Sequence, residues 1–155
     1  MKKLTKVEQT AYRWMSKNGI ALLRISIGIV FFWFGVQKFF PGLSSAEELA
    51  SRTIETLSFG LLQKSASMIL LGAWEVLIGM TFITGYWMRL AIPLLLLQMI
   101  GTIMPLFLYP AETFVPPPLV PTLVGQYIIK NIVIITGAMV VGAYHQGLIT
   151  IKTKA

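Results

Sequence analysis

Long runs of apolar residues, separated by short polar links, dominate the chain. Four of these runs cover about residues 19–37, 67–85, 90–109 and 123–143. Each is close to the roughly 20 residues that an α-helix needs to cross about 30 Å of hydrocarbon. The runs lack the alternation of a membrane β-barrel, and backbone exposed to lipid must satisfy its own hydrogen bonds. The pattern therefore predicts an all-α fold, a membrane-spanning four-helix bundle with up-down-up-down topology.

Two shorter amphipathic segments accompany these spans. In residues 1–18, apolar side chains recur at helical spacing among lysines: Leu4, Val7, Ala11 and Trp14. This spacing predicts an amphipathic helix on the cytoplasmic leaflet. Between the first two spans, Ser45 to Glu48 has the pattern of a capping box. The apolar residues that follow it are Ala50, Ile54, Leu57 and Leu61. We therefore expect a short outer helix that rests its apolar face on the membrane or the bundle.

The last outer link differs from the first because it is rich in proline. It covers residues 109–122 and holds Pro116, Pro117 and Pro118. Proline fixes the backbone φ angle and favours the polyproline II conformation. We expect this link to be extended and stiff.

The composition confines the chain to one class of protein. Its 155 residues are 55% hydrophobic and only 12% charged, and the mean hydropathy is +0.74. A soluble domain of about 150 residues still exposes roughly a third of the area of its unfolded chain, so it could not hide this much apolar surface. A soluble globule, a disordered chain and a fibrous repeat are excluded, and an integral membrane protein remains.

The charges predict an orientation in the membrane. Lys and Arg number 13 against six acidic residues, a net charge of +7. On one side lie Lys2, Lys3, Lys6, Arg13, Lys17, Arg89, Lys152 and Lys154. On the other side lie Lys38, Arg52 and Lys64, diluted by Glu47, Glu48, Glu55 and Glu112. The positive-inside rule then places both termini, including a tail over 144–155, in the cytoplasm. The membrane surface is the expected counter-charge, and no nucleic acid partner is expected.

The first span could instead be a secretory signal peptide, because it follows a basic segment. However, the apolar run is long, and no small-residue cleavage site follows it. We therefore expect a retained helix.

Two residue types are scarce enough to limit the chemistry. The chain has no cysteine, which excludes thiol catalysis, disulfides, cysteine-held zinc and iron–sulfur clusters. It has a single histidine, His145, so bis-histidine haem ligation within the chain is excluded and no metal site is expected. We expect His145 to lie at the membrane interface.

Three charged residues fall well inside the predicted spans: Arg24, Glu75 and Lys130. Each costs at least ~2.5–3.5 kcal/mol on insertion scales unless it turns away from lipid. Glu75 and Lys130 both lie roughly 10–12 Å from the outer boundary, at 1.5 Å per residue. The sequence therefore predicts an ion pair between them.

Each span also places polar residues and glycine on one stripe, and the stripe of the third span includes a proline as well. The stripes are Arg24, Gly28, Phe31, Gly35 and Lys38; Gly72, Glu75 and Gly79; Gln98, Gly101 and Pro105; and Gln126, Lys130, Val133 and Gly137. Asn131 points about 100° away from its neighbour Lys130. Glycine lets helix backbones approach, and polar groups hydrogen-bond across the gap. Pro105 frees a backbone carbonyl that needs a local partner.

Two interpretations of these polar residues remain open. They either fix the register of the helices or form a ligand site near the outer leaflet. The candidate ligand-binding residues are Glu75, Lys130, Gln126, Gln98, Asn131, Lys38 and Arg24. Arg24 and Lys38 lie near span ends, where they could instead reach lipid phosphates. The pattern assigns no catalytic residue.

Several short segments together resemble one family. They are Leu23-Arg24, Phe32 to Phe39, Pro41 to Glu48, Trp74 to Val76, Gln98-Met99, Pro110 to Phe114 and Gly125 to Asn131. The chain resembles the DoxX-like membrane proteins, including the YkgB-type group of uncharacterised inner-membrane proteins. The resemblance implies a four-helix membrane bundle. Some relatives are associated with quinone-linked oxidation of sulfur compounds and others with oxidative-stress responses. Without cysteine, this chain does not itself exchange thiols.

These observations lead to three hypotheses of function. In the first, the chain is a redox-linked membrane component that binds quinone, or another amphipathic small molecule, at the intramembrane Glu–Lys site. Its chemistry would then need a bound cofactor or a partner, such as a larger membrane redox complex. In the second, it is a non-catalytic subunit or scaffold of a larger membrane complex. In the third, it is a small transporter that acts as a homo-oligomer. The sequence does not decide whether the protein is an enzyme.

Overall fold

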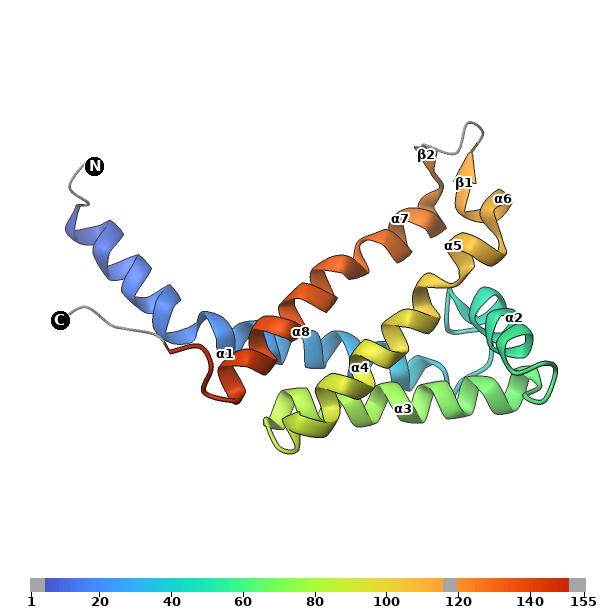
Figure 1. Cartoon of the computed structure of the whole chain (residues 1–155), viewed down its shortest axis with the longest axis horizontal. Coiled ribbons are helices and arrows are strands. Elements are labelled where there is room, and N and C mark those ends of the chain that lie inside the picture. The colour runs from blue at the N-terminus through green and yellow to red at the C-terminus, as the bar shows by residue number, and fades with distance from the viewer. Residues whose placement is uncertain (1–4, 116–119, 151–155) are drawn as a thin grey trace.

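The computed structural model describes residues 5–115 and 120–150 of the chain. Figure 1 shows an assembly of helices joined by short links. The helices are α1 (Lys6–Gln37), α2 (Glu47–Leu57), α3 (Lys64–Thr84), α4 (Met88–Ile103), α5 (Pro105–Leu108), α6 (Pro110–Thr113), α7 (Leu123–Ile129) and α8 (Asn131–His145). Two short strands, β1 (Phe114–Val115) and β2 (Val120–Pro121), pair antiparallel.

The four predicted spans are confirmed. Within the described residues, four helical stretches are long and apolar enough to cross a membrane: 6–37, 64–84, 88–108 and 123–145. The third stretch joins α4 to α5, and the fourth joins α7 to α8. The all-α four-helix bundle expected from the sequence is therefore the fold.

Glycines bring α1 and α3 into backbone contact. A Cβ atom added to Gly79 would lie 2.5 Å from the Phe32 backbone nitrogen, and one added to Gly35 would lie 2.8 Å from the Val76 nitrogen. Both distances are shorter than real Cβ contacts allow. The predicted stripes of the first two spans therefore face each other, and larger side chains would force the helices apart.

The apolar core lies between this pair and the helices α4 and α8. Its most deeply buried side chains come from three spans: Ile78 and Phe82 in α3, Leu95 in α4, and Ala138 and Val141 in α8. The buried face of α4 is apolar, so the predicted polar stripe of the third span is only partly enclosed.

Two spans are interrupted in their outer halves. In the third span, Pro105 cannot donate to Gly101, and the Met104 N–H donates to the Gly101 carbonyl instead, at 3.2 Å. The local partner expected for this freed carbonyl is therefore present. In the fourth span, α7 ends before Lys130, and α8 begins after it.

The amino-terminal segment is helical, as predicted, but it is not a separate helix. Figure 1 shows α1 projecting beyond the rest of the bundle at its amino-terminal end. The helix begins with a capping box in which Thr5 and Glu8 bond reciprocally, and it continues unbroken into the first span. A single glycine, Gly19, costs only about 1 kcal/mol and does not end the helix.

The short helix predicted between the first two spans is confirmed as α2, but its predicted capping box and apolar buried face are wrong. Ala46 precedes α2 without a side-chain cap, and the Glu47 carboxylate instead accepts from the Gly42 N–H at 2.7 Å. The buried face of α2 holds Ser51 and Thr53, whose hydroxyls donate to carbonyls of their own helix. These internal bonds allow small polar residues to be buried, and Leu57 on the predicted apolar face stays exposed.

The proline-rich link is not extended throughout. Residues 110–113 form the short helix α6, and the paired strands follow it. Pro116, Pro117 and Pro118, which carried the prediction of stiffness, lie outside the described residues.

Candidate intramembrane polar site

Glu75 is the centre of a buried polar cluster in the membrane-spanning part of the bundle. It lies 11 residues after Lys64, where α3 begins, which corresponds to about 16 Å along the helix. One carboxylate oxygen lies 2.6 Å from the Lys38 Nζ, and the other accepts from the Gln98 Nε2 at 2.7 Å. The side chains of Lys38 and Glu75 are only 7% and 11% exposed. Three spans thus contribute one polar group each to a site shielded from lipid.

The close packing of α1 and α3 positions the ion pair. Lys38 follows α1 directly and caps it, with its backbone N–H donating to the carbonyls of Gly35 and Val36. A Cβ atom added to Gly72 would lie 3.1 Å from the Lys38 Cβ. The absence of a side chain at Gly72 therefore lets Lys38 reach Glu75 one turn further along α3.

Two hydrogen-bonding positions of this cluster remain open. The Gln98 Oε1 atom is buried and has no partner among the described residues. The Lys38 ammonium contacts the Glu75 carboxylate and, at 3.4 Å, the Phe34 carbonyl, which uses two of its three donors. The site can therefore accept one hydrogen bond and donate another to a further group.

Aromatic rings cover the side of the site nearest α7. The rings of Phe34 and Tyr127 meet edge to face, with centroids 6.2 Å apart. Phe34 also presents its backbone carbonyl to the Lys38 ammonium, at 3.4 Å. The fourth span thus approaches the site through an aromatic side chain.

The predicted ion pair between Glu75 and Lys130 does not form, because Lys38 takes that position. Lys130 is exposed, and its Nζ lies 4.0 Å above the centre of the Tyr127 ring. The rotation of α7 explains this difference. Gly125 packs so tightly that an added Cβ would lie 2.1 Å from the Thr113 carbonyl oxygen, which turns the predicted polar stripe outward.

The remaining candidates from the fourth span are not gathered at Glu75 either. Gln126 is exposed, and its Nε2 donates to the Pro121 carbonyl at 3.3 Å. Asn131 is 6% exposed and faces the bundle interior. The buried face at the start of this span is therefore formed by Gly125, Ile128 and Asn131 instead of the predicted Gln126 and Lys130.

Arg24 serves the opposite end of α3. Its Nη1 donates to the carbonyls of Phe82 and Ile83, the latter at 2.9 Å. These carbonyls belong to the last turn of α3, where the backbone lacks helical partners and the helix dipole favours a cation. Arg24 is therefore a helix cap and is separated from Glu75 by about two turns of α3.

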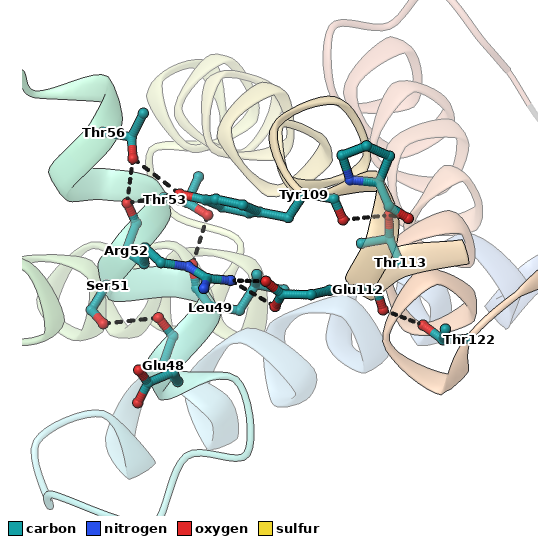
Figure 2. A network of polar contacts seen from close by, with 11 residues as sticks. Glu48, Leu49, Ser51, Arg52, Thr53, Thr56, Tyr109, Glu112, Thr113 and Thr122 are labelled. Carbon is teal, nitrogen blue, oxygen red and sulfur yellow. Dashed lines mark hydrogen bonds and ion pairs between the residues drawn. The ribbon is translucent and has the colours of Figure 1, made fainter. Parts of the chain in front are cut away.

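A second polar cluster ties the outer links together, and Figure 2 shows it from close by. An Arg52 nitrogen lies 2.6 Å from both carboxylate oxygens of Glu112, and the guanidinium stacks 4.1 Å from the centre of the Tyr109 ring. The Tyr109 hydroxyl in turn lies 3.0 Å from that of Thr56. Hydrogen bonding to Glu112 raises the pKa of Arg52 above its already high usual value.

This outer cluster joins α2 to the end of the third span. From the sequence, these charges are predicted only to lie on the same side of the membrane. The opposite charges of Arg52 and Glu112 were the one indication in the sequence that the two residues could pair. Because 60 residues separate them, their spacing along the chain could not predict the contact.

The described residues offer no further site near Glu75. No three side chains among their His, Cys, Asp and Glu residues gather where they could hold a metal ion. Two surface pockets occur beside the loop that joins α3 to α4, and neither reaches the polar site.

Four apolar helices around a buried charged pair define a multi-pass helical membrane protein. The model of the DoxX family matches residues 19–109, which is more than half of the chain. The protein therefore belongs to the DoxX family, and the resemblance noted in its sequence is confirmed. Comparisons with curated proteins and with solved structures found no match.

Proposed function

We propose that the protein binds the head group of an amphipathic small molecule at the cluster of Glu75, Lys38 and Gln98. The observation that carries this proposal is the buried Gln98 Oε1, which has no donor among the described residues. A buried acceptor without a partner costs about 1–3 kcal/mol. A ligand that donates a hydrogen bond to this atom removes that cost.

A quinone is the candidate ligand that fits these groups. The Lys38 ammonium can donate to a carbonyl oxygen, and Gln98 Oε1 can accept from a hydroxyl of the reduced form. Phe34 and Tyr127 offer aromatic surface beside these groups. A bound quinone would supply electron transfer, whereas the residues of the chain bind and orient it. The protein would then act as a redox-linked component of its membrane.

Titration of the purified protein with the reduced quinol, in a mild detergent, tests this proposal. We expect Gln98→Leu to weaken quinol binding, because it removes the acceptor of the quinol hydroxyl and leaves the ion pair of Lys38 and Glu75 in place. The matched control is Lys130→Gln, since Lys130 is exposed and contacts Tyr127 rather than Glu75. Equal quinol binding by the wild type and Gln98→Leu, or no quinol binding by the wild type, would reject the site.

We also propose that the spans lie in a bacterial inner membrane with both termini in the cytoplasm, because Lys and Arg concentrate on that side. The absence of native cysteine makes single-cysteine labelling clean. Ser45→Cys should react with an impermeant maleimide in intact spheroplasts, whereas Ser16→Cys should react only after lysis. Both serines are exposed. The reverse pattern would invert the orientation.

A second candidate function is that of a subunit or scaffold. Near α2, the side chains of Phe59 and Leu61 are 94% and 83% exposed, and Phe59 is held in a left-handed backbone conformation with φ 54°. A fixed apolar projection of this kind suits contact with another membrane protein. Copurification that is lost on Phe59→Ser would support this function, and a solitary wild-type protein in native gels would oppose it.

A further inference from the structure

A groove lies where α4 begins and α8 ends, and Figure 1 shows this region at the end of the bundle away from α2. Its volume is about 650 Å³, and it is lined by Trp87, Met88, Arg89, Leu90 and His145. Met88 is 1% exposed and anchors the start of α4. An added Cβ at Gly142 would lie 2.9 Å from the Ile92 side chain, so α8 and α4 pack closely beside the groove. The groove is therefore part of a firmly packed helix junction.

The groove presents positive charge without a compensating acid. Arg89 and His145 are exposed, and neither forms an ion pair within the described part of the chain. The sequence has no acidic residue between Glu75 and Glu112, and none after Glu112. Two hydrogen-bond donors thus line a space in which no carboxylate of the described chain pairs with them.

We propose that this groove binds the phosphate group of an anionic phospholipid. The planar guanidinium of Arg89 can donate two parallel hydrogen bonds to phosphate oxygens. The imidazole of His145 donates one hydrogen bond even when it is neutral. Trp87, 75% exposed, has the amphipathic ring that settles at the level of lipid head groups. The start of α4, which lacks a side-chain cap, adds partial positive charge.

The apolar surroundings favour a lipid over free phosphate. Leu90 lines the groove and is 56% exposed, and Leu97 on the same helix is 57% exposed. Residues seven apart share one face of a helix. These leucines therefore form an apolar track along α4, from the groove toward the middle of the span. An acyl chain can follow this track while its phosphate stays in the groove.

Native mass spectrometry of the protein in a neutral detergent tests the proposal. The probes are dioctanoyl phosphatidylglycerol, dioctanoyl phosphatidylcholine and inorganic phosphate. We expect phosphatidylglycerol to bind at least tenfold more tightly than phosphatidylcholine, whose choline cation lies beside the phosphate. We expect Arg89→Gln to weaken phosphatidylglycerol binding by about tenfold, or about 1.4 kcal/mol. His145→Leu should weaken it less, since it removes a single donor.

Arg13→Gln is the matched control. Arg13 is exposed on α1 and does not line the groove, and its substitution removes the same positive charge as Arg89→Gln. Unchanged binding in this variant supports a local site. Equal losses in Arg13→Gln and Arg89→Gln would show attraction to overall charge and overturn the proposal. Equal affinities for the two lipids, or binding of inorganic phosphate as tight as that of phosphatidylglycerol, would also overturn it. A thermal midpoint for Arg89→Gln equal to that of the wild type in lipid-free detergent separates lost binding from misfolding.

Discussion

The ion pair between Lys38 and Glu75 allows a quantitative test of the proposed architecture. Its two side chains are 7% and 11% exposed, and their charged atoms are 2.6 Å apart. Removing one partner of a buried pair leaves the other charge unpaired and costs about 3–5 kcal/mol. We expect Lys38→Met and Glu75→Leu each to destabilise the protein by at least about 3 kcal/mol. Glu75→Leu should be the more costly, because it also removes the acceptor of Gln98.

The double variant should behave differently from the sum of the single ones. Replacing both partners of a buried pair with apolar residues is often neutral or stabilising. The combination of Lys38→Met and Glu75→Leu should therefore be no less stable than Glu75→Leu alone, which requires a coupling energy of at least about 3 kcal/mol. The open Gln98 side chain should keep the recovery below complete.

Thermal unfolding in detergent measures these differences, and the four tryptophans of the chain provide the fluorescence signal. A loss of about 3 kcal/mol corresponds to a fall in Tm of roughly 6–12 °C for a chain of this size. Lys130→Met serves as the control, because Lys130 is exposed and a surface substitution changes stability by about 0.5 kcal/mol or less. Additive losses in the double variant, or a larger loss in Lys130→Met than in Lys38→Met, would refute the pairing.

Four further substitutions test the glycine positions, the Arg24 cap and the ion pair of Arg52 and Glu112. Gly79→Val should lower Tm strongly, because an added Cβ would lie 2.5 Å from the α1 backbone. Gly101→Ala should raise stability by about 0.5–1 kcal/mol, because an added Cβ at this position meets no atom within 4 Å. Arg24→Gln should lower the free energy of unfolding by about 1.5–3 kcal/mol, since it removes the charged donor to the carbonyls in the last turn of α3. An unchanged Tm would contradict the role of Arg24 as a cap. Glu112→Gln should cost less than about 1 kcal/mol, because its pair with Arg52 is 41% and 51% exposed, and exchanging the two residues should restore the wild-type Tm.

The spans were predictable because one requirement controls them. A helix must present about 20 apolar residues to cross the hydrocarbon, and the sequence reports that run directly. The packing of α1 on α3 was predictable for a related reason. Gly28, Gly35, Gly72 and Gly79 recur at steps of seven on two helices, and only a close neighbour makes such small residues useful in a membrane.

The partner of Glu75 could not be predicted from depth alone. Lys130 and Lys38 both lie in the outer half of the bundle, so depth permits either pair. The choice depends on the rotation of α7, which is set by the contact between Gly125 and the Thr113 carbonyl oxygen in the outer link. That contact is a tertiary feature, and no periodicity within the fourth span reports it.

The structure also changes what the polar stripes mean. A shared stripe of polar residues and glycine predicts the interior of each span, and this prediction is wrong for the first half of the fourth span. There the interior begins with Gly125, Ile128 and Asn131, and Lys130 faces outward with its charge over an aromatic ring. A lysine reaches polar surroundings through its long stem, so its position on a helix does not fix where its charge lies. Glu75 has a shorter stem and depends on groups brought to it. Glu75 therefore forms its contacts only where the packing of the helices brings Lys38 and Gln98 within hydrogen-bonding distance. The polar cluster is thus a consequence of helix packing as well as a candidate site.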